Sequence, residues 1–89
     1  MKLTFTRQAL KEYKSWETSN PGIVDKIDEL IADIFENGFI NGKGKPEKMK
    51  HYKDPVRFSR TINHGNRLVY CHNGKDLLII SCKGHYDDK

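Results

Sequence analysis

Hydrophobic residues recur at helical spacing over the first third of the chain. The first such stripe, at three- and four-residue spacing, consists of Ala9, Leu10, Tyr13 and Trp16. A second stripe consists of Ile23, Val24, Ile27, Leu30, Ile31, Ile34 and Phe35. Thr6 and Asn20-Pro21 are typical helix starts, and Asn37-Gly38 is typical of a helix end. The pattern predicts a short strand over Lys2–Phe5, then two helices, the second ending at about Glu36.

Beyond Gly38 the hydrophobic period changes from helical to two. Residues 41–47 are rich in Gly and Lys and predict a flexible basic loop. Alternating segments then predict three strands, over 56–62, 66–72 and 76–83, joined by turns at His64-Gly65 and Asn73-Gly74. The expected fold is α+β, in the order β-α-α-β-β-β, with two N-terminal helices packed on one face of a small, mostly antiparallel twisted sheet. At 89 residues, the chain is expected to form a single domain over 1–89.

The turns also predict which side chains share a face of the sheet. A two-residue turn at Asn73-Gly74 places Cys71 opposite Asp76, and one at His64-Gly65 places Arg60 opposite Val69. In that register the residues packed under the helices are Leu68, Tyr70, Leu77 and Ile79. Arg60 and Arg67 then share the other face with Phe58, where two arginines among apolar residues suit a phosphate-bearing ligand. The alternative is that both arginines are solvated residues at the rim.

Charge separates the two halves of the chain. Residues 1–41 carry five Lys/Arg and seven Asp/Glu, a net charge of −2, whereas residues 42–89 carry eleven and five, a net charge of +6. A basic half favours a polyanionic partner such as nucleic acid, although a generally soluble surface explains it equally well.

Other classes of protein are disfavoured by composition. The longest apolar run is Leu77–Ile80, far shorter than a membrane span, and no apolar leader begins the chain, so we expect a cytoplasmic protein without membrane association. Cys71 and Cys82 are expected to be free thiols, and neither a metal nor a cofactor is expected.

Candidate groups for chemistry concentrate in the basic half, and they are Glu47, Lys50, His51, Arg60, Arg67 and His85. Cleaving RNA without a metal requires a base for the 2′-OH proton, an acid for the leaving 5′ oxygen, and cations near the phosphate. These residue types can fill those roles. Each also has an ordinary surface explanation, and spacing alone favours simple RNA binding over cleavage.

Three motifs in fixed order carry a family resemblance. Gly42-Lys43-Gly44-Lys45-Pro46-Glu47, then Arg67-Leu68-Val69-Tyr70, and finally Ser81-Cys82-Lys83-Gly84-His85-Tyr86 resemble the YoeB/Txe toxins of the RelE superfamily. The resemblance implies a type II toxin that cleaves mRNA in the A site of the 70S ribosome. It also implies neutralisation by an antitoxin of the YefM/Axe kind, and it makes a homodimer plausible.

The resemblance further implies roles for individual residues. Glu47 would be the general base, His85 the general acid, and Arg67 the stabiliser of the transition-state phosphate. The residues implied to support substrate binding are Lys50, His51, Arg60 and Tyr86.

The chain departs from the family pattern at several points. It has Thr61 where a second consecutive arginine is common, and Gly65 where an acid that would orient Arg67 is common. It also continues as Asp87-Asp88-Lys89. A regular final strand would turn His85 toward the helices, so its catalytic role requires an irregular strand end, which Gly84 permits.

Two other functions remain open. A ribosome- or RNA-binding module could block translation without cleaving, given the same basic half and the missing acid at Gly65. A small structural partner with no RNA role is the third alternative, and salt-dependent binding to RNA would argue against it.

Overall fold

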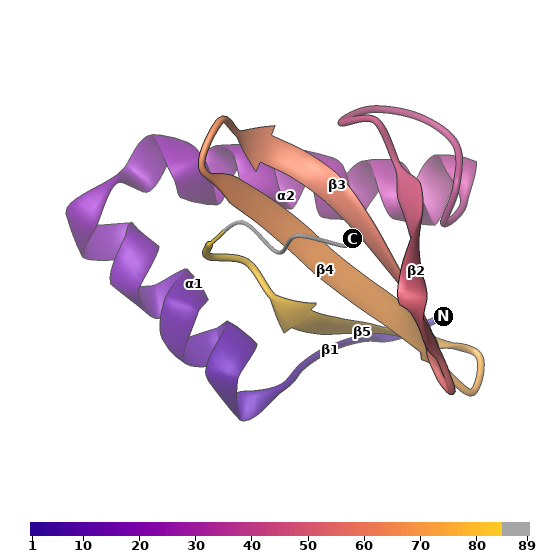
Figure 1. Cartoon of the computed structure of the whole chain (residues 1–89). Helices are drawn as coiled ribbons and strands as arrows, with labels where there is room; N and C mark the ends of the chain where they lie inside the picture. Colours follow the sequence, from indigo (N-terminus) through magenta and orange to yellow (C-terminus); the bar gives the residue numbers. More distant parts are fainter. Residues whose placement is uncertain (85–89) are drawn as a thin grey trace.

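Two helices pack on one face of a five-stranded sheet in the computed structural model, which describes residues 1–84 (Figure 1). The elements are β1 (Leu3–Phe5), α1 (Arg7–Ser19), α2 (Pro21–Asn37), β2 (Glu47–Lys53), β3 (Val56–Asn63), β4 (Asn66–Asn73) and β5 (Asp76–Ser81). The sheet order is β1-β5-β4-β3-β2; β1 is parallel to β5 and the other pairs are antiparallel. The predicted α+β class is confirmed. The sequence prediction missed β2, whose first residue it had placed in a loop.

The helix boundaries follow the capping residues. The Thr6 hydroxyl accepts a hydrogen bond from the Ala9 amide at 3.1 Å, as predicted for an N-cap. Asn20 occupies the N-cap position of α2 without a side-chain bond, and Pro21 supplies the preset backbone angle of the first turn. Gly38, at φ 93°, ends α2 in a conformation that favours glycine. None of the described helices is long and apolar enough to cross a membrane.

The core lies between the helices and one face of the sheet. Its fully or nearly fully buried members include Ala9, Ile27, Leu30, Ile34, Leu68, Tyr70, Leu77, Ile79 and Cys82. The four strand residues predicted to pack under the helices all have no exposed surface, so this part of the face assignment is confirmed. Both cysteines are buried and free, as expected.

The register of the hairpins differs from the prediction in two ways. Cys71 pairs with Leu78 rather than Asp76, a shift of two residues that leaves the side chains up to Ile79 on their predicted faces. Beyond Ile79 the pairing skips Ile80 and places Ser81 opposite Val69. Between β3 and β4 the shift is one residue, because the pairing skips Ile62 and places Arg60 opposite Leu68. A one-residue slip reverses the faces. The prediction that Arg60 shares a face with Arg67 is therefore wrong, and Phe58 also packs toward the core.

Arg60 is a buried hub that fixes the loop between α2 and β2. Its side chain has no exposed surface, and all its N–H groups face acceptors. It donates to Tyr70 Oη (2.9 Å), Asp33 Oδ2 (2.5 Å), and the carbonyls of Lys43 (2.9 Å), Gly38 (2.7 Å) and Asn41 (2.7 Å). Arg60 is therefore occupied within the fold, and its expected role in substrate binding is corrected to a structural one.

Two glycines let the loop approach this hub closely. A Cβ on Gly42 would lie 1.9 Å from Asp33 Oδ2, and one on Gly44 would lie 2.8 Å from Leu30 Cδ2. Both have positive φ, 111° and 80°, which side chains rarely adopt. The Gly44 carbonyl accepts from the Thr61 amide at 2.7 Å. The GKGK sequence is thus explained by a loop pressed against α2 and β3.

Replacing Arg60 should destabilise the fold strongly. In Arg60→Met the three loop carbonyls lose the donor that Arg60 supplies, and the Asp33 carboxylate loses its charged partner. Breaking a buried pair in this way costs about 3–5 kcal/mol. Urea unfolding at neutral pH measures the loss. Arg7→Ala, which removes an exposed arginine from α1, is the matched control and should stay within about 0.5 kcal/mol of the unchanged protein. Equal unfolding of both variants would contradict the hub role.

Stability should also fall in acid through Asp33. Hydrogen bonds from Arg60 and from the Lys43 amide hold the pKa of Asp33 below its usual value. A carboxyl group with a depressed folded-state pKa contributes stability above its unfolded pKa of about 3.9, and that contribution is lost as pH falls through the folded value. Urea unfolding across that acid range should show a shallower pH dependence for Asp33→Asn. Parallel pH curves for the two proteins would contradict this assignment.

Candidate active site

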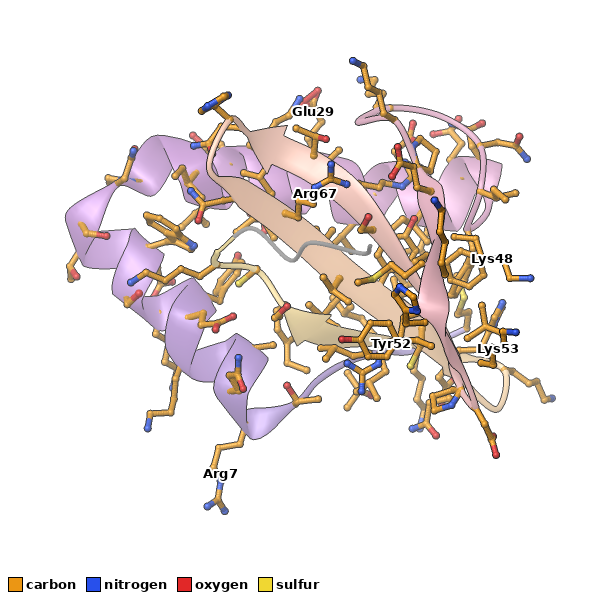
Figure 2. All side chains as sticks on the ribbon, viewed as in Figure 1. Arg7, Glu29, Lys48, Tyr52, Lys53 and Arg67 are labelled. Atoms are coloured by element: carbon orange, nitrogen blue, oxygen red, sulfur yellow. The ribbon has the colours of Figure 1, made fainter. Side chains whose placement is uncertain are left out.

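Glu47, Ser59 and Arg67 meet on the face of the sheet away from the helices. Glu47 pairs with Ser59 across β2 and β3, and Arg67 pairs with Thr61 across β3 and β4. Arg67 Nη1 donates to Ser59 Oγ at 3.2 Å and lies 3.5 Å from Glu47 Oε2. Figure 2 marks Arg67 on β4. The structure thus brings together the predicted base and the predicted phosphate-binding arginine.

Glu47 is more exposed to solvent than Arg67, whose guanidinium is partly buried. The Glu47 side chain is 62% exposed and that of Arg67 is 23% exposed. Arg67 Nε is buried and has no hydrogen-bond partner within the described part of the chain. A buried donor without a partner is costly, so an anion that bound this guanidinium would satisfy it.

Ser59 was missed by the sequence analysis because of the register error. Because side chains alternate along a strand, placing Arg60 on the open face implies that Ser59 points toward the helices. In the structure Ser59 is buried on the open face and contacts the Arg67 guanidinium. The polar residues Arg57, Ser59 and Thr61 alternate along β3, and this alternation could have indicated that they share the open face.

The chain after β5 is held beside Arg67. The pairing between β4 and β5 skips Ile80, and β5 ends at Ser81, so the irregular strand end required by the sequence analysis is present. The Gly84 amide donates to Asn66 Oδ1 at 2.8 Å, and the Gly84 carbonyl accepts from the Arg67 amide at 2.9 Å. His85 and Tyr86 lie outside the described residues.

Helix α1 fixes the same segment from the other side. Glu12 Oε1 accepts from the Cys82 amide at 2.8 Å, and Trp16 Nε1 donates to the Cys82 carbonyl at 2.9 Å. Lys83 Nζ lies 5.1 Å from the centre of the Trp16 ring. Residues 82–84 therefore have a defined path between α1 and β4. The sequence analysis placed Trp16 in the hydrophobic stripe of the first helix and did not anticipate its role as a hydrogen-bond donor.

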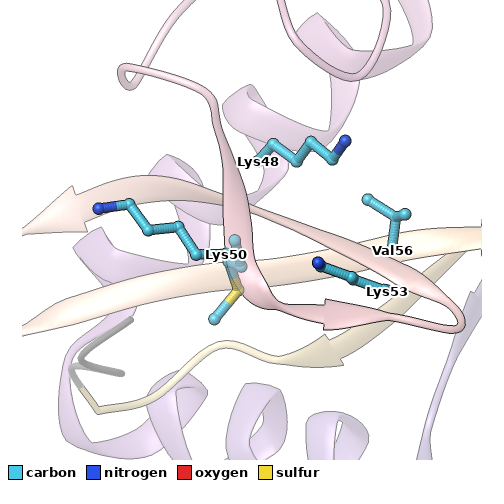
Figure 3. A pocket seen from close by; sticks show the side chains of 5 residues that line it. Lys48, Lys50, Lys53 and Val56 are labelled. Carbon is cyan, nitrogen blue, oxygen red and sulfur yellow. The ribbon is translucent and has the colours of Figure 1, made fainter. Parts of the chain in front are cut away.

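Lys50 and His51 lie on β2, where both are exposed. Lys50 lines an open hollow of about 470 Å³ along β2, together with Lys48, Met49, Lys53 and Val56 (Figure 3). Three of its five lining residues are lysines. The described residues contain no cluster of three metal-ligating side chains.

Comparisons with known proteins identify the family of this chain. Residues 5–86 match the family model described as a YoeB-like toxin of bacterial type II toxin–antitoxin systems. The chain is 41% identical to toxin YoeB of Escherichia coli K12 over 86 residues, covering 97% of this chain and 100% of the relative. Toxin YoeB of Streptomyces coelicolor is 36% identical, with 97% and 100% coverage.

Solved structures give the same result. The YoeB dimer of Staphylococcus aureus superposes with a TM-score of 0.88 at 41% identity, covering 97% of this chain and 98% of that chain. The archaeal RelE–RelB complex of Pyrococcus horikoshii is 15% identical with a TM-score of 0.72, covering 93% and 92%, and shows the RelE-like fold alone. The resemblance stated from the motifs is confirmed: this chain belongs to the YoeB toxin family of bacterial type II toxin–antitoxin systems.

Proposed function

We propose that this toxin is a metal-independent endoribonuclease that inhibits translation by cleaving mRNA in the A site of the ribosome. The observation that carries the proposal is the pairing of an exposed carboxylate, Glu47, with the guanidinium of Arg67, 3.5 Å away on the open face of the sheet. A base and a cation at this spacing suit transfer of the 2′-OH proton next to the phosphate. Membership in a toxin family supports the same reading.

In the proposed reaction Glu47 takes the proton from the 2′-OH as the 2′ oxygen attacks the adjacent phosphorus. Arg67 binds the phosphate oxygens, on which negative charge accumulates, and its unpartnered Nε adds a further donor. His85 gives a proton to the departing 5′ oxygen. The products are a 2′,3′-cyclic phosphate, or its hydrolysed form, and a 5′-hydroxyl.

Because the chain has Thr61 and Gly65 in place of the residues common in the family, phosphate binding depends more on Arg67. Thr61 pairs directly with Arg67, so no second arginine stands beside it at that position. Ser59 and Glu47 are the side chains that contact the guanidinium among the described residues. We propose that these two contacts orient Arg67 in place of the acid that the family commonly has near Gly65.

The remaining predicted residues and partners follow from the same proposal. Lys50 and His51 would bind the RNA along β2, and Tyr86 would position a nucleotide. Two Staphylococcus aureus relatives were solved as a YoeB dimer and as a YoeB–YefM heterotetramer. We propose that an antitoxin of the YefM/Axe kind neutralises this chain, a single RelE-like domain over 1–89, in the cytoplasm, and that a homodimer can form.

Cleavage should depend on all three proposed catalytic residues. Glu47→Gln, Arg67→Leu and His85→Gln should each lower the rate of message cleavage by about 10²–10⁴-fold, the usual contribution of a positioned acid or base. Primer extension on a translated message with purified ribosomes measures the new 5′ ends. Glu36→Gln, on the exposed surface of α2, and Arg7→Ala are the matched controls and should cleave normally.

The same assay separates the alternative functions. Arrest of translation without new 5′ ends would favour a non-cleaving inhibitor and reject the nuclease proposal. Cleavage by Glu47→Gln at the unchanged rate would reject the role of Glu47 alone. Binding to ribosomes that does not weaken with salt would favour a structural partner with no RNA role.

Asn66 should act on cleavage by positioning the segment that leads to His85. In Asn66→Ala the Gly84 amide loses its acceptor, so exchange of the Arg67 amide proton, which is bonded to the Gly84 carbonyl, should become faster. The rate of mRNA cleavage should fall as the Arg67 amide proton loses its protection against exchange. Asn66→Asp keeps the acceptor oxygen and should restore both. Loss of cleavage with normal protection at Arg67 would contradict the positioning role.

A further inference from the structure

A second arginine, Arg57, lies on the same open face as Arg67. Side chains alternate along β3, so Arg57, Ser59 and Thr61 share this face. Arg57 pairs with Cys71 and Thr61 pairs with Arg67, which puts the two arginines four residues apart along the sheet. At about 3.3 Å per residue this puts their Cα atoms roughly 13 Å apart along the strands. The Arg67 guanidinium is bonded to Ser59 and the Arg57 guanidinium lies over Tyr52, so the two are held at separate places on this face.

The Arg57 guanidinium is held in place by an aromatic ring rather than by a carboxylate. Its central carbon lies 4.4 Å from the centre of the Tyr52 ring, a cation–π arrangement across the β2–β3 hairpin. Arg57 Nε is buried and has no hydrogen-bond partner among residues 1–84. None of the ion pairs within that part of the chain involves Arg57. The guanidinium is thus oriented, charged and left with a spare donor.

A small hollow lies beside Arg57. Its volume is about 160 Å³, and its walls include Tyr52, Met49, Gln8 and Ser81 as well as Arg57 itself. Pockets for drug-sized ligands usually measure about 300–1,000 Å³, so this hollow suits one small group rather than a whole ligand. Met49 of β2, which is 4% exposed, forms part of the wall of this hollow. An anion in the hollow would lie beside the Arg57 guanidinium.

We infer that Arg57, braced by Tyr52, forms a second phosphate site that binds a backbone phosphate of the RNA flanking the cleaved bond. The inference rests on the proposed function, since it takes RNA as the ligand of this face. Tyr52 covers one side of the guanidinium, so the groups left for binding are its N–H edges, which match the oxygens of a phosphate. Arg67 holds the reacting phosphate, and Arg57 holds the strand about 13 Å away.

The test removes the charge from one RNA phosphate at a time. Ribosomes are programmed with a message that carries a 2′-deoxynucleotide at the cleaved position, which prevents cleavage, and a single neutral methylphosphonate linkage at successive flanking positions. The unchanged protein should lose about tenfold in affinity at one flanking linkage, in keeping with loss of a hydrogen bond between charged groups. Arg57→Ala should bind more weakly to the all-phosphate message and show no further loss at that linkage.

Three further variants sharpen the result. Arg57→Lys keeps the charge but not the planar fork, and it should retain only part of the sensitivity. Tyr52→Ala removes the ring that braces Arg57 and should lose part of the sensitivity. Arg7→Ala removes the same charge from an arginine that points away from the sheet (Figure 2), and it should leave the sensitivity intact. Thermal unfolding of each variant confirms that it is folded.

Each outcome decides the question. If no flanking linkage matters to the unchanged protein, or if Arg57→Ala keeps the full sensitivity, the inference is overturned. A change in base preference in Arg57→Ala without loss of linkage sensitivity would overturn it in favour of base contact. The modified message is never cut, so the proposed function is tested separately on normal mRNA. If binding is sensitive to the linkage but normal mRNA is not cleaved, only the nuclease proposal is rejected. If normal mRNA is cleaved but binding is not sensitive to any linkage, only the Arg57 site is rejected.

Discussion

The saturated guanidinium of Arg60 is the interaction on which the rest of the open face depends. It binds three carbonyls of the loop after α2, so this loop has one position relative to β3. Tyr70 extends the network, because its hydroxyl accepts from Arg60 and donates to the Phe39 carbonyl at 2.6 Å. The strand that follows, β2, starts with Glu47. Arg60, buried under the helices, thereby helps to determine the position of the Glu47 carboxylate on the opposite face of the sheet.

One skipped residue in β3 decides which arginines serve the fold and which face outward. Because the pairing passes over Ile62, Arg60 points to the core and Arg57 to the open face. Without that irregularity the two would exchange sides, and a charge would be buried without its partners on α2. The bulge therefore fixes the core and the distribution of charge on the open face at the same time.

Local rules predicted much of this molecule, and long-range pairing limited the rest. Thr6, Pro21 and Gly38 mark helix boundaries through their own backbone chemistry, so they could be read directly. The strand β2 could not, because Met49 is its one buried residue and its neighbours are mostly lysines. Ser59 was missed for a different reason: its contact with Arg67 depends on register, which turn residues suggested but a bulge altered. The family motifs identified Glu47 and Arg67 without any need for register.

The two edges of the sheet also determine how the chain avoids pairing with copies of itself. An unpaired strand edge is a template for another strand, and proteins protect such edges by keeping them short or by charging them. At one edge β1 has only three residues, and at the other β2 carries Lys48, Lys50 and Lys53. Lysines that suit an RNA backbone therefore also disfavour edge-to-edge aggregation, so substituting them all would expose the chain to a hazard unrelated to its substrate.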